Sequence, residues 1–351
     1  MAFLKLCIFV ILALTFVFAL PIPSVSSGSR RLANSRKPLA VTLKPTSPLL
    51  NKKRIPQAAT AVSAVPATAS TYQGGQVFNG MTYSPYNSDG SCPDLATVST
   101  QLTFLSKYTS SIRLYSTDCN QLAFVLQAIS QSSLPLKVHA GVWASSGVDR
   151  ANSEIDTVVS LVSNSAYSGI VADVSVGNEV IYGNLLTESQ LISLINSAKS
   201  KLASANVSIP VYTTEVDSSM TAGLIAAIDL VQVNLQTMFD ATYTSISDSV
   251  DSIFTRLDNV KAISNGKTVR IGEVGYCHAG QVGAQVGSPD SQSQYIQAFT
   301  CKAKSLGVSY FIFEALDATW KTGSSLAEQS FGIFSRSLVP NISIPSSSQT
   351  C

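Results

Sequence analysis

Two glutamates stand where buried strands are expected to end, and both could take part in acid–base chemistry. An apolar run over residues 171–177 is followed by Asn178 and Glu179, and a second run over residues 268–275 carries Glu273 flanked by glycines. Paired carboxyl groups that face one site carry out glycoside hydrolysis, one as general acid and the other as nucleophile or base. The sequence therefore predicts that Glu179 and Glu273 meet and cleave a glycosidic bond.

Eight short apolar runs are the elements that must bring these glutamates together. The runs are continuous, as expected of strands that are buried on both faces. They cover residues 77–83, 111–116, 136–143, 171–177, 211–216, 230–237, 268–275 and 309–316. Eight strands, each followed by a helix, predict an α/β fold of the (β/α)8 TIM-barrel type over residues 76–340, with the active site at the carboxyl ends of the strands.

Helical patterns lie between the runs. Apolar residues recur at helical spacing over residues 94–108, and a capping box that begins at Thr187 precedes a helix over 191–205. Later helices are predicted over 248–263 and 291–306. A doubly wound open sheet is the rival fold, but it requires a Gly-rich phosphate turn after the first strand, and none is present.

The segments outside the barrel predict secretion. Residues 1–19 have the pattern of a signal peptide, residues 20–75 read as a disordered Ser/Thr/Pro-rich pro-segment or linker, and residues 341–351 form a C-terminal tail. Residues 1–72 hold nine Lys or Arg and no acid, which leaves the rest with 14 bases and 21 acids, a charge of −7. We therefore expect no nucleic-acid partner, and no membrane span in the mature form.

The cysteines and sequons fit the same oxidising compartment. Cys92 and Cys119 follow the first two strands and are predicted to form a disulfide. Cys301 could pair with Cys277 or with Cys351, and an unpaired cysteine such as Cys351 could link the protein to a cell wall. Glycosylation is predicted at two sequons, which begin at Asn206 and Asn341.

No metal or other cofactor is predicted. His139 and His278 are the only histidines, so a three-histidine metal site is impossible, and no Cys/His spacing typical of zinc is present. Both are read as ordinary structural histidines.

Six short motifs occur in order along residues 78–334. They are Tyr83-Ser84-Pro85-Tyr86, Ile112-Arg113-Leu114-Tyr115, Val176-Gly177-Asn178-Glu179, Ile271-Gly272-Glu273-Val274-Gly275, Phe313-Glu314-Ala315 and Ser330-Phe331-Gly332. Their order and spacing resemble glycoside hydrolase family 17, within it the fungal cell-wall β-1,3-glucanase and glucanosyltransferase branch. The resemblance implies a secreted retaining enzyme that remodels cell-wall β-glucan, as an endo-β-1,3-glucanase or a β-1,3-glucanosyltransferase.

The resemblance also assigns roles within the site. It implies that Glu179 is the acid/base, that Glu273 is the nucleophile, and that Asn178 binds the sugar 2-hydroxyl. Retention requires the two carboxyl groups to lie roughly 5–5.5 Å apart. Further substrate-binding residues are expected among polar and aromatic side chains near strand ends, with Arg113 able to orient Glu273 or to form a structural ion pair. They are Tyr83, Arg113, Tyr115, Phe239, Glu314, Trp320, Lys321 and Glu328.

Several alternatives stay open. Glu215, at the end of the fifth run, is a rival nucleophile, a carboxylate that supports the site without touching the substrate, or an ordinary loop carboxylate. Tyr276-Cys277 stands where the family usually has Trp-Pro, and Ala318 where many relatives have an acid, so the exact substrate is not fixed. The chain could be a same-clan glycosidase of another substrate, or a non-catalytic glucan-binding wall protein, although the presence of both glutamates argues against the latter.

Overall fold

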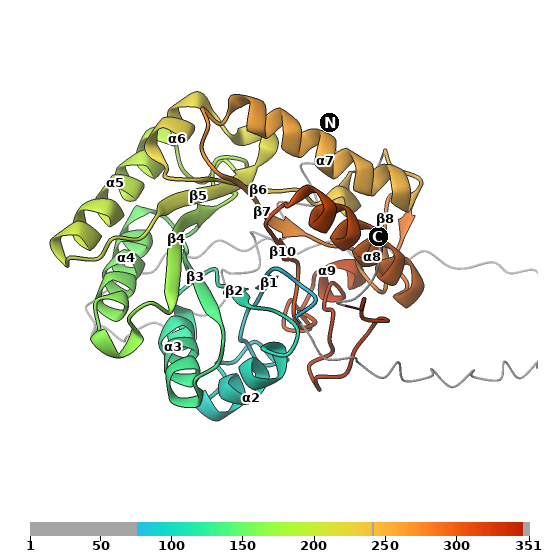
Figure 1. Ribbon diagram of the computed structural model, residues 1–351, viewed down its shortest axis with the longest axis horizontal. Helices are drawn as coiled ribbons and strands as arrows, with labels where there is room; N and C mark the ends of the chain where they lie inside the picture. The colour runs from blue at the N-terminus through green and yellow to red at the C-terminus, as the bar shows by residue number, and fades with distance from the viewer. Residues whose placement is uncertain (1–75, 241, 347–351) are drawn as a thin grey trace, which may run out of the picture. The chain divides into compact units, whose positions relative to one another are not determined.

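The computed structural model describes residues 76–240 and 242–346, and the predictions made for residues 1–75 and 347–351 lie outside this part of the chain. A closed parallel barrel occupies its centre, with strand order β1-β10-β7-β6-β5-β4-β3-β2 and with helices around the outside (Figure 1). The predicted (β/α)8 barrel is confirmed.

Six of the eight barrel strands are shorter than the apolar runs that predicted them, and β4 extends one residue beyond its run. β5 spans the whole of its run, whereas β1, at the start of the barrel, keeps only two residues of its run. The strands are β1 Met81–Thr82, β2 Ser111–Arg113, β3 Lys137–Val142, β4 Val171–Asn178, β5 Val211–Val216, β6 Val231–Asn234, β7 Val269–Val274 and β10 Tyr310–Ile312.

A helix follows each of these strands in the described residues. They are α2 Leu95–Leu105, α3 Gln121–Ser132, α4 Val148–Val162, α5 Glu188–Ser204, α6 Ala222–Ala227, α7 Ile246–Ile263, α8 Pro289–Leu306 and α9 Leu326–Gln329. The predicted capping box is present at Thr187, whose side chain accepts from the Gln190 backbone N–H. A second capping box at Ser288, with Pro289 at the first helical position, begins α8.

Four 3-10 helices and a small hairpin connect the barrel elements on this part of the chain. The 3-10 helices are η2 Asp118–Asn120, η3 Ser165–Tyr167, η4 Asp217–Ser219 and η5 Thr237–Phe239, and the hairpin pairs β8 Gln281–Val282 with β9 Gln285–Val286. None of the described helices is long and apolar enough to cross a membrane.

A layer of charged and polar side chains lies inside the barrel. Asp173 on β4 accepts hydrogen bonds from Tyr212 on β5 at 2.8 Å and from Arg270 on β7 at 3.0 Å, and His139 on β3 lies 2.8 Å from it. Burial alone would raise the pKa of Asp173, but its hydrogen bonds and the nearby charges of His139 and Arg270 lower that pKa to about 2. This layer ties β3, β4, β5 and β7 together.

The chain continues to pack against the barrel beyond residue 340, where the tail was predicted to begin. Ile342 is 7% exposed, and the Asn341 side-chain amide donates to Asp317 and to the Gly332 carbonyl at 2.9 and 3.0 Å. Residues 341 and 342 therefore belong structurally to the barrel domain.

Candidate active site

The two predicted glutamates lie at the carboxyl ends of β4 and β7, as the apolar runs indicated. Glu179 directly follows β4 and is half-buried, and Glu273 is the penultimate residue of β7 and is 6% exposed. One side chain, Asn234 at the end of β6, connects their surroundings: its Nδ2 donates to Glu179 Oε1 at 2.7 Å, and its Oδ1 lies 3.5 Å from the Arg113 Nη1 that also contacts Glu273.

An irregularity in β4 sets the position of Glu179. The register of β4 against β5 shifts between Ser175 and Asn178, which is the signature of a β-bulge. Gly177 inside this shift has φ +84°, and Glu179 itself has φ +54°, a left-handed conformation that is unusual for a residue with a side chain. The bulge turns the backbone at the end of the strand, and Glu179 then reaches Asn234.

Three side chains donate hydrogen bonds to Glu273. The Tyr115 hydroxyl group donates to Oε1 at 2.7 Å, Arg113 Nη1 donates to the same oxygen at 3.1 Å, and Gln236 Nε2 donates to Oε2 at 3.3 Å. Donors on both oxygens stabilise the ionised form of a carboxyl group. The three donors therefore fix the orientation of the Glu273 carboxyl group.

Glu179 has the opposite environment. Burial, then the negative charge of Glu273 and, more weakly, that of Glu215 raise the pKa of Glu179 to about 7, against the lowering effect of the hydrogen bond from Asn234. A carboxyl group with a pKa near neutrality keeps its proton in mildly acidic solution and can deliver it to a leaving oxygen. The two carboxyl groups therefore lie in different surroundings, and those of Glu179 raise its pKa.

Arg113 on β2 holds several groups of this site in place through its buried guanidinium group. It is 1% exposed, and its guanidinium group donates to Asn178 Oδ1 at 2.7 Å and to the Gly272 carbonyl at 2.9 Å, in addition to Glu273. Gly272 leaves the room for this cluster, because a Cβ there would lie 2.7 Å from Asn234 Oδ1. Arg113 therefore orients the site rather than lying exposed to a ligand.

Asn178 is held with its amide oxygen turned inward. This oxygen accepts from Arg113 and, at 3.1 Å, from Asn234, so the amide nitrogen of the half-exposed side chain is left to donate. That orientation suits the hydroxyl-binding role expected for Asn178.

Three of the other predicted residues gather after β10. Glu314 is 3% exposed, and burial raises its pKa to about 7 in spite of the nearby charge of Lys321. Lys321 Nζ lies 5.1 Å from the centroid of the Phe313 ring and 5.6 Å from that of Trp320. The negative charge of Glu273 contributes to the raised pKa of Glu314, so the residues that follow β10 border the site.

Trp320 has an aromatic neighbour that the sequence analysis did not select as a site residue. Its ring lies 4.7 Å from that of Tyr86, in the loop after β1, and both side chains are half-buried. The pair joins the loops that follow the first and last strands of the barrel.

The remaining predicted positions are less close to the carboxyl groups. Phe239 is half-buried and stacks on Phe331 at 5.7 Å, while Glu328 is 6% exposed and burial raises its pKa. Tyr83 is 1% exposed, and its hydroxyl group donates to Gln101 in α2 at 2.5 Å. Tyr83 thus packs between the barrel and its helical layer and does not line the site as expected.

Asn234 and Gln236 are the site residues that the sequence analysis missed. Both lie at the end of the sixth apolar run, where the rule that selected Glu179 and Glu273 applies equally. A strand-end amide is a weaker signal of catalysis than a carboxyl group because it cannot transfer a proton in this chemistry. No group of three or more His, Cys, Asp or Glu side chains able to hold a metal ion is found within residues 76–240 and 242–346.

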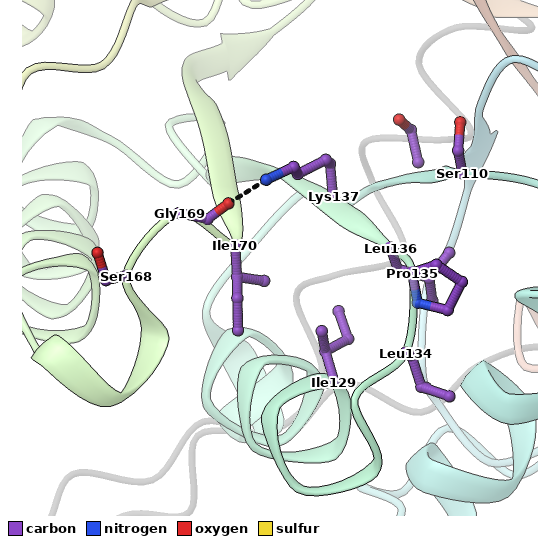
Figure 2. Close-up of a pocket in the computed structure, with 10 residues that line it drawn as sticks. Ser110, Ile129, Leu134, Pro135, Leu136, Lys137, Ser168, Gly169 and Ile170 are labelled. Atoms are coloured by element: carbon purple, nitrogen blue, oxygen red, sulfur yellow. Dashed lines mark hydrogen bonds between the residues drawn. The ribbon is translucent and has the colours of Figure 1, made fainter.

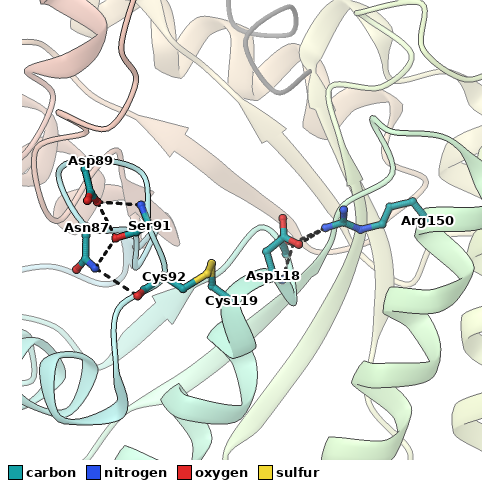
Figure 3. The surroundings of a disulfide bond; sticks show 8 residues. Asn87, Asp89, Ser91, Cys92, Asp118, Cys119 and Arg150 are labelled. Atoms are coloured by element: carbon teal, nitrogen blue, oxygen red, sulfur yellow. Dashed lines mark hydrogen bonds and ion pairs between the residues drawn. A yellow bond between two sulfur atoms is a disulfide. The ribbon is translucent and has the colours of Figure 1, made fainter. Parts of the chain in front are cut away.

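The predicted Cys92–Cys119 disulfide is confirmed. It joins the loop after β1 to η2, with a Cα–Cα distance of 5.1 Å, and next to it Asp118 forms an ion pair with Arg150 of α4 (Figure 3). The disulfide therefore links two neighbouring loops at the same end of the barrel as the glutamates.

The Cys277–Cys301 pairing is wrong. Cys277 is a free, buried thiol at the end of β7, whereas Cys301 is disulfide-bonded. α8 begins at Pro289, so Cys301 lies 12 residues into the helix, about 18 Å along its axis, too far from the end of β7 for a disulfide. The other two cysteines, Cys7 and Cys351, lie outside the described residues, so a Cys301–Cys351 pair stays a prediction.

A hollow of about 520 Å³ lies away from these residues (Figure 2). It is lined mainly by apolar side chains at the amino ends of β3 and β4, including Leu136 and Ile170, and Lys137 donates to the Gly169 carbonyl beside it. The amino ends of the strands are opposite to the carboxyl ends, so this hollow is not part of the glutamate site.

Known proteins are similar to this chain in sequence and in fold. The BtgE/BtgC glycoside hydrolase domain matches residues 80–332. A putative glucan endo-1,3-beta-glucosidase of Aspergillus niger is 30% identical over 77% of this chain and 44% of its own length. A probable family 17 glucosidase of Saccharomyces cerevisiae is 34% identical over 73% of this chain and 64% of its own length.

Among solved structures, a glycoside hydrolase family 17 β-1,3-glucanosyltransferase from Rhizomucor miehei is similar, with a TM-score of 0.69 and 24% identity over 77% of this chain and 98% of that one. This likeness supports the fold. The chain spans less than half the length of the Aspergillus relative. From the extent of the domain match, together with these relatives, the chain belongs to the BtgE/BtgC glycoside hydrolase domain family, in the fungal branch of glycoside hydrolase family 17.

Proposed function

We propose that this protein is a retaining glycosidase or transglycosylase acting on β-1,3-glucan, with Glu179 as acid/base and Glu273 as nucleophile. The observation that carries the proposal is the opposite setting of the two carboxyl groups. Glu273 accepts hydrogen bonds from three side chains, whereas the pKa of Glu179 is raised to about 7 by burial and by the charge of Glu273. Relatives named glucan endo-1,3-beta-glucosidase and β-1,3-glucanosyltransferase support β-1,3-glucan as the substrate.

The first half-reaction forms a glycosyl-enzyme. Glu273 attacks the anomeric carbon, Glu179 gives its proton to the leaving glycosidic oxygen, and the sugar becomes esterified to Glu273. The amide nitrogen of Asn178 is free to bind the 2-hydroxyl, where a hydrogen bond strengthens as positive charge develops on the ring. Arg113 and Tyr115 hold the Glu273 carboxyl group in place for the attack.

The second half-reaction decides between hydrolysis and transfer. Glu179, now ionised, takes a proton from water or from a sugar hydroxyl group, and the resulting oxygen attacks the anomeric carbon and releases Glu273. Both outcomes use the same catalytic residues, so the acceptor that reaches the intermediate determines the product.

Laminari-oligosaccharides test the substrate and the reaction together. The purified protein should shorten them, and the appearance of products longer than the substrate would identify transfer. Proton NMR of the first products should show the β-anomer, and an initial α-anomer would reject retention and the 5–5.5 Å spacing expected of it. Binding without any change in chain length, by protein shown to be folded, would favour the non-catalytic glucan-binding alternative.

We further propose that the protein is secreted and works at the fungal cell wall. The signal-peptide pattern of residues 1–19 and the family 17 relatives support this location. A wall linkage through Cys351 would compete for the same thiol with the predicted Cys301–Cys351 disulfide. Extraction of walls with hot detergent, with and without reductant, tests the linkage, because release without reductant would reject it.

The two sequons are not equally suited to carry a glycan. Asn206 is exposed at the end of α5, whereas both amide hydrogens of Asn341 are engaged by Asp317 and Gly332. We propose glycosylation at Asn206, with Asn341 left unmodified. Endoglycosidase treatment should remove the same mass from the secreted protein and from its Asn341→Gln variant, and no mass from Asn206→Gln. If Asn206→Gln loses as much mass as the unmutated protein, the assignment is wrong.

A further inference from the structure

Glu215 on β5 is a buried carboxylate whose contacts are directed at the backbone next to the acid/base. It is 0% exposed, and its two oxygens accept from the backbone N–H groups of Ile181 at 2.9 Å and Tyr182 at 3.2 Å. These residues lie two and three positions after Glu179. Because backbone donors occupy both oxygens, this carboxylate acts on the loop and is not a second nucleophile.

The backbone at Glu179 needs such support. Its φ of +54° belongs to the left-handed region, which is strained for a residue with a side chain and persists only where the surroundings impose it. β5 supplies two restraints on this turn. The Thr214 carbonyl accepts from the Glu179 N–H at 2.8 Å, and Glu215 holds the two residues that follow Val180.

The charge of Glu215 also reaches the acid/base. Charged and polar groups approach Glu179 from four strands: Glu273 on β7, Asn234 on β6, Glu215 on β5 and Arg113 on β2. Glu215 adds to the negative potential that favours the protonated form of Glu179, although burial and Glu273 contribute more.

We propose that Glu215 is a positioning residue for the acid/base: it clamps the turn at residues 180–182 and so fixes where Glu179 presents its proton. The inference rests on the proposed catalytic role of Glu179. Glu215 itself touches neither substrate nor reacting atoms. It acts through the backbone at Ile181 and Tyr182 and, more weakly, through its charge.

The choice of leaving group tests the proposal. Glu215→Gln preserves the shape of the side chain but removes its charge and places an amide N–H₂ against one backbone donor. We expect kcat/KM on laminari-oligosaccharides to fall about 10²-fold, the loss typical of a small misplacement of a catalytic group. On a 2,4-dinitrophenyl β-glucoside, kcat/KM should change by much less, because the dinitrophenolate leaving group departs without taking up a proton.

Glu154 on α4 provides the matched control. It is 3% exposed, and one of its oxygens accepts from the backbone N–H groups of Thr117 and Trp143, in loops that do not carry the acid/base. Glu154→Gln should lower the melting temperature, as Glu215→Gln does, without a leaving-group dependence. If Glu215→Gln and Glu154→Gln reduce kcat/KM on both substrates in the same proportion, Glu215 is only structural and the proposal is wrong.

A further variant separates the inference from the proposed function. Glu179→Ala should lose activity on laminari-oligosaccharides but keep most of its kcat/KM on the dinitrophenyl glycoside, because kcat/KM reports formation of the glycosyl-enzyme and that step needs no acid there. Equal loss of kcat/KM on both substrates would reject Glu179 as the acid. The alkaline limb of kcat/KM should move to lower pH in Glu215→Gln, because loss of the negative charge lowers the pKa of Glu179. Glu215→Asp keeps the negative charge but is too short to contact both backbone N–H groups. It should lower kcat/KM and leave the alkaline limb of the pH profile at the wild-type pH. If the limb stays at the wild-type pH in Glu215→Gln as well, the charge of Glu215 has no effect on Glu179.

Discussion

At the scale of single residues, the site depends on one buried guanidinium group. Arg113 holds Glu273, Asn178 and the Gly272 carbonyl with two nitrogens, so it fixes the nucleophile and the predicted hydroxyl-binding amide relative to each other. The planar fork of arginine allows these contacts in different directions, whereas the single ammonium group of lysine does not.

Arg113→Lys should therefore damage catalysis although it keeps the charge. We expect kcat on laminari-oligosaccharides to fall by about 10²-fold, since Glu273 and Asn178 lose their common support. The melting temperature should also fall, because the fully buried site is left with unsatisfied groups. Steady-state kinetics and thermal unfolding check both effects, and a variant that keeps wild-type kcat would show that Arg113 forms only a structural ion pair.

The sequence predicted the two glutamates correctly as strand-end residues but could not supply their partners. Asn234 meets Glu179 and Gln236 meets Glu273 because β6 pairs with β7 in the register that sets Asn234 opposite Glu273, and an apolar run does not show that register. The burial of Tyr83 was missed for a related reason. An aromatic residue near a strand end can face either the barrel interior or the helices, and the one-residue register that decides this is not visible in a continuous apolar run.

At the scale of elements, the irregular end of β4 is the feature on which the site depends most. Apolar runs predicted the strands and their order, yet they extended past the paired residues. Residues 77–80 of the first run illustrate the cause: Phe78 makes only an isolated bridge with Thr109 and is nevertheless 2% exposed. Hydrophobicity reports burial, and burial continues where regular backbone pairing stops.

Gly177→Ala tests the bulge in β4. Alanine at φ +84° is strained by roughly 1–2 kcal/mol, and its Cβ would lie 3.2 Å from Val180 Cγ2, so the backbone that carries Glu179 should shift. Gly266→Ala is the matched control, because Gly266 has φ +76° in a turn with open space around it. Both variants should lose similar unfolding free energy, but only Gly177→Ala should lose kcat, and equal activities would contradict this account.

The Cys92–Cys119 disulfide should stabilise the loops at the same end of the barrel. It spans a sequence separation of 27 residues, for which the chain-entropy estimate is about 3.5 kcal/mol. The double variant Cys92→Ser/Cys119→Ser should unfold at lower urea concentration, in proportion to a loss of about 2–4 kcal/mol. Cys277→Ala, which removes the free buried thiol, is the control and leaves the cross-link intact. An unchanged urea midpoint in the double variant would mean that the loops are held by their other contacts.

At the scale of the whole molecule, the buried acids predict how stability depends on pH. Burial raises the pKa of Glu179, Glu215 and Glu314 to about 7, whereas the pKa of Asp173 is lowered to about 2 by His139 and Arg270 in spite of burial. A raised carboxyl pKa gives stability that is present below the unfolded value of about 4.3 and is lost as pH rises through 7. The lowered pKa of Asp173 gives stability that is present above about 3.9 and is lost as pH falls toward 2.

The free energy of unfolding should therefore be highest between about pH 4 and 5. Urea unfolding at a series of pH values from 3 to 8 measures the curve. Glu314→Gln removes one of the three raised groups and should make the decline above pH 5 less steep, whereas Asp173→Asn should make the decline below pH 4 less steep. A stability that increases steadily toward pH 8 would contradict the assigned environments.

The closure of the barrel between β1 and β10 has a consequence for how the chain is made. Met81 pairs with Ile312, and Tyr310 N donates to Asn79 Oδ1 across 231 positions of sequence, so the ring is completed by nearly the last strand to be synthesised. Until then β1 and β7 each present an unpaired edge, and such edges favour association between chains. A nascent chain of this protein must therefore be kept apart from its copies until β10 is synthesised. The yield of folded protein should then depend on chaperones and on the rate of synthesis more than the stability of the finished barrel would suggest.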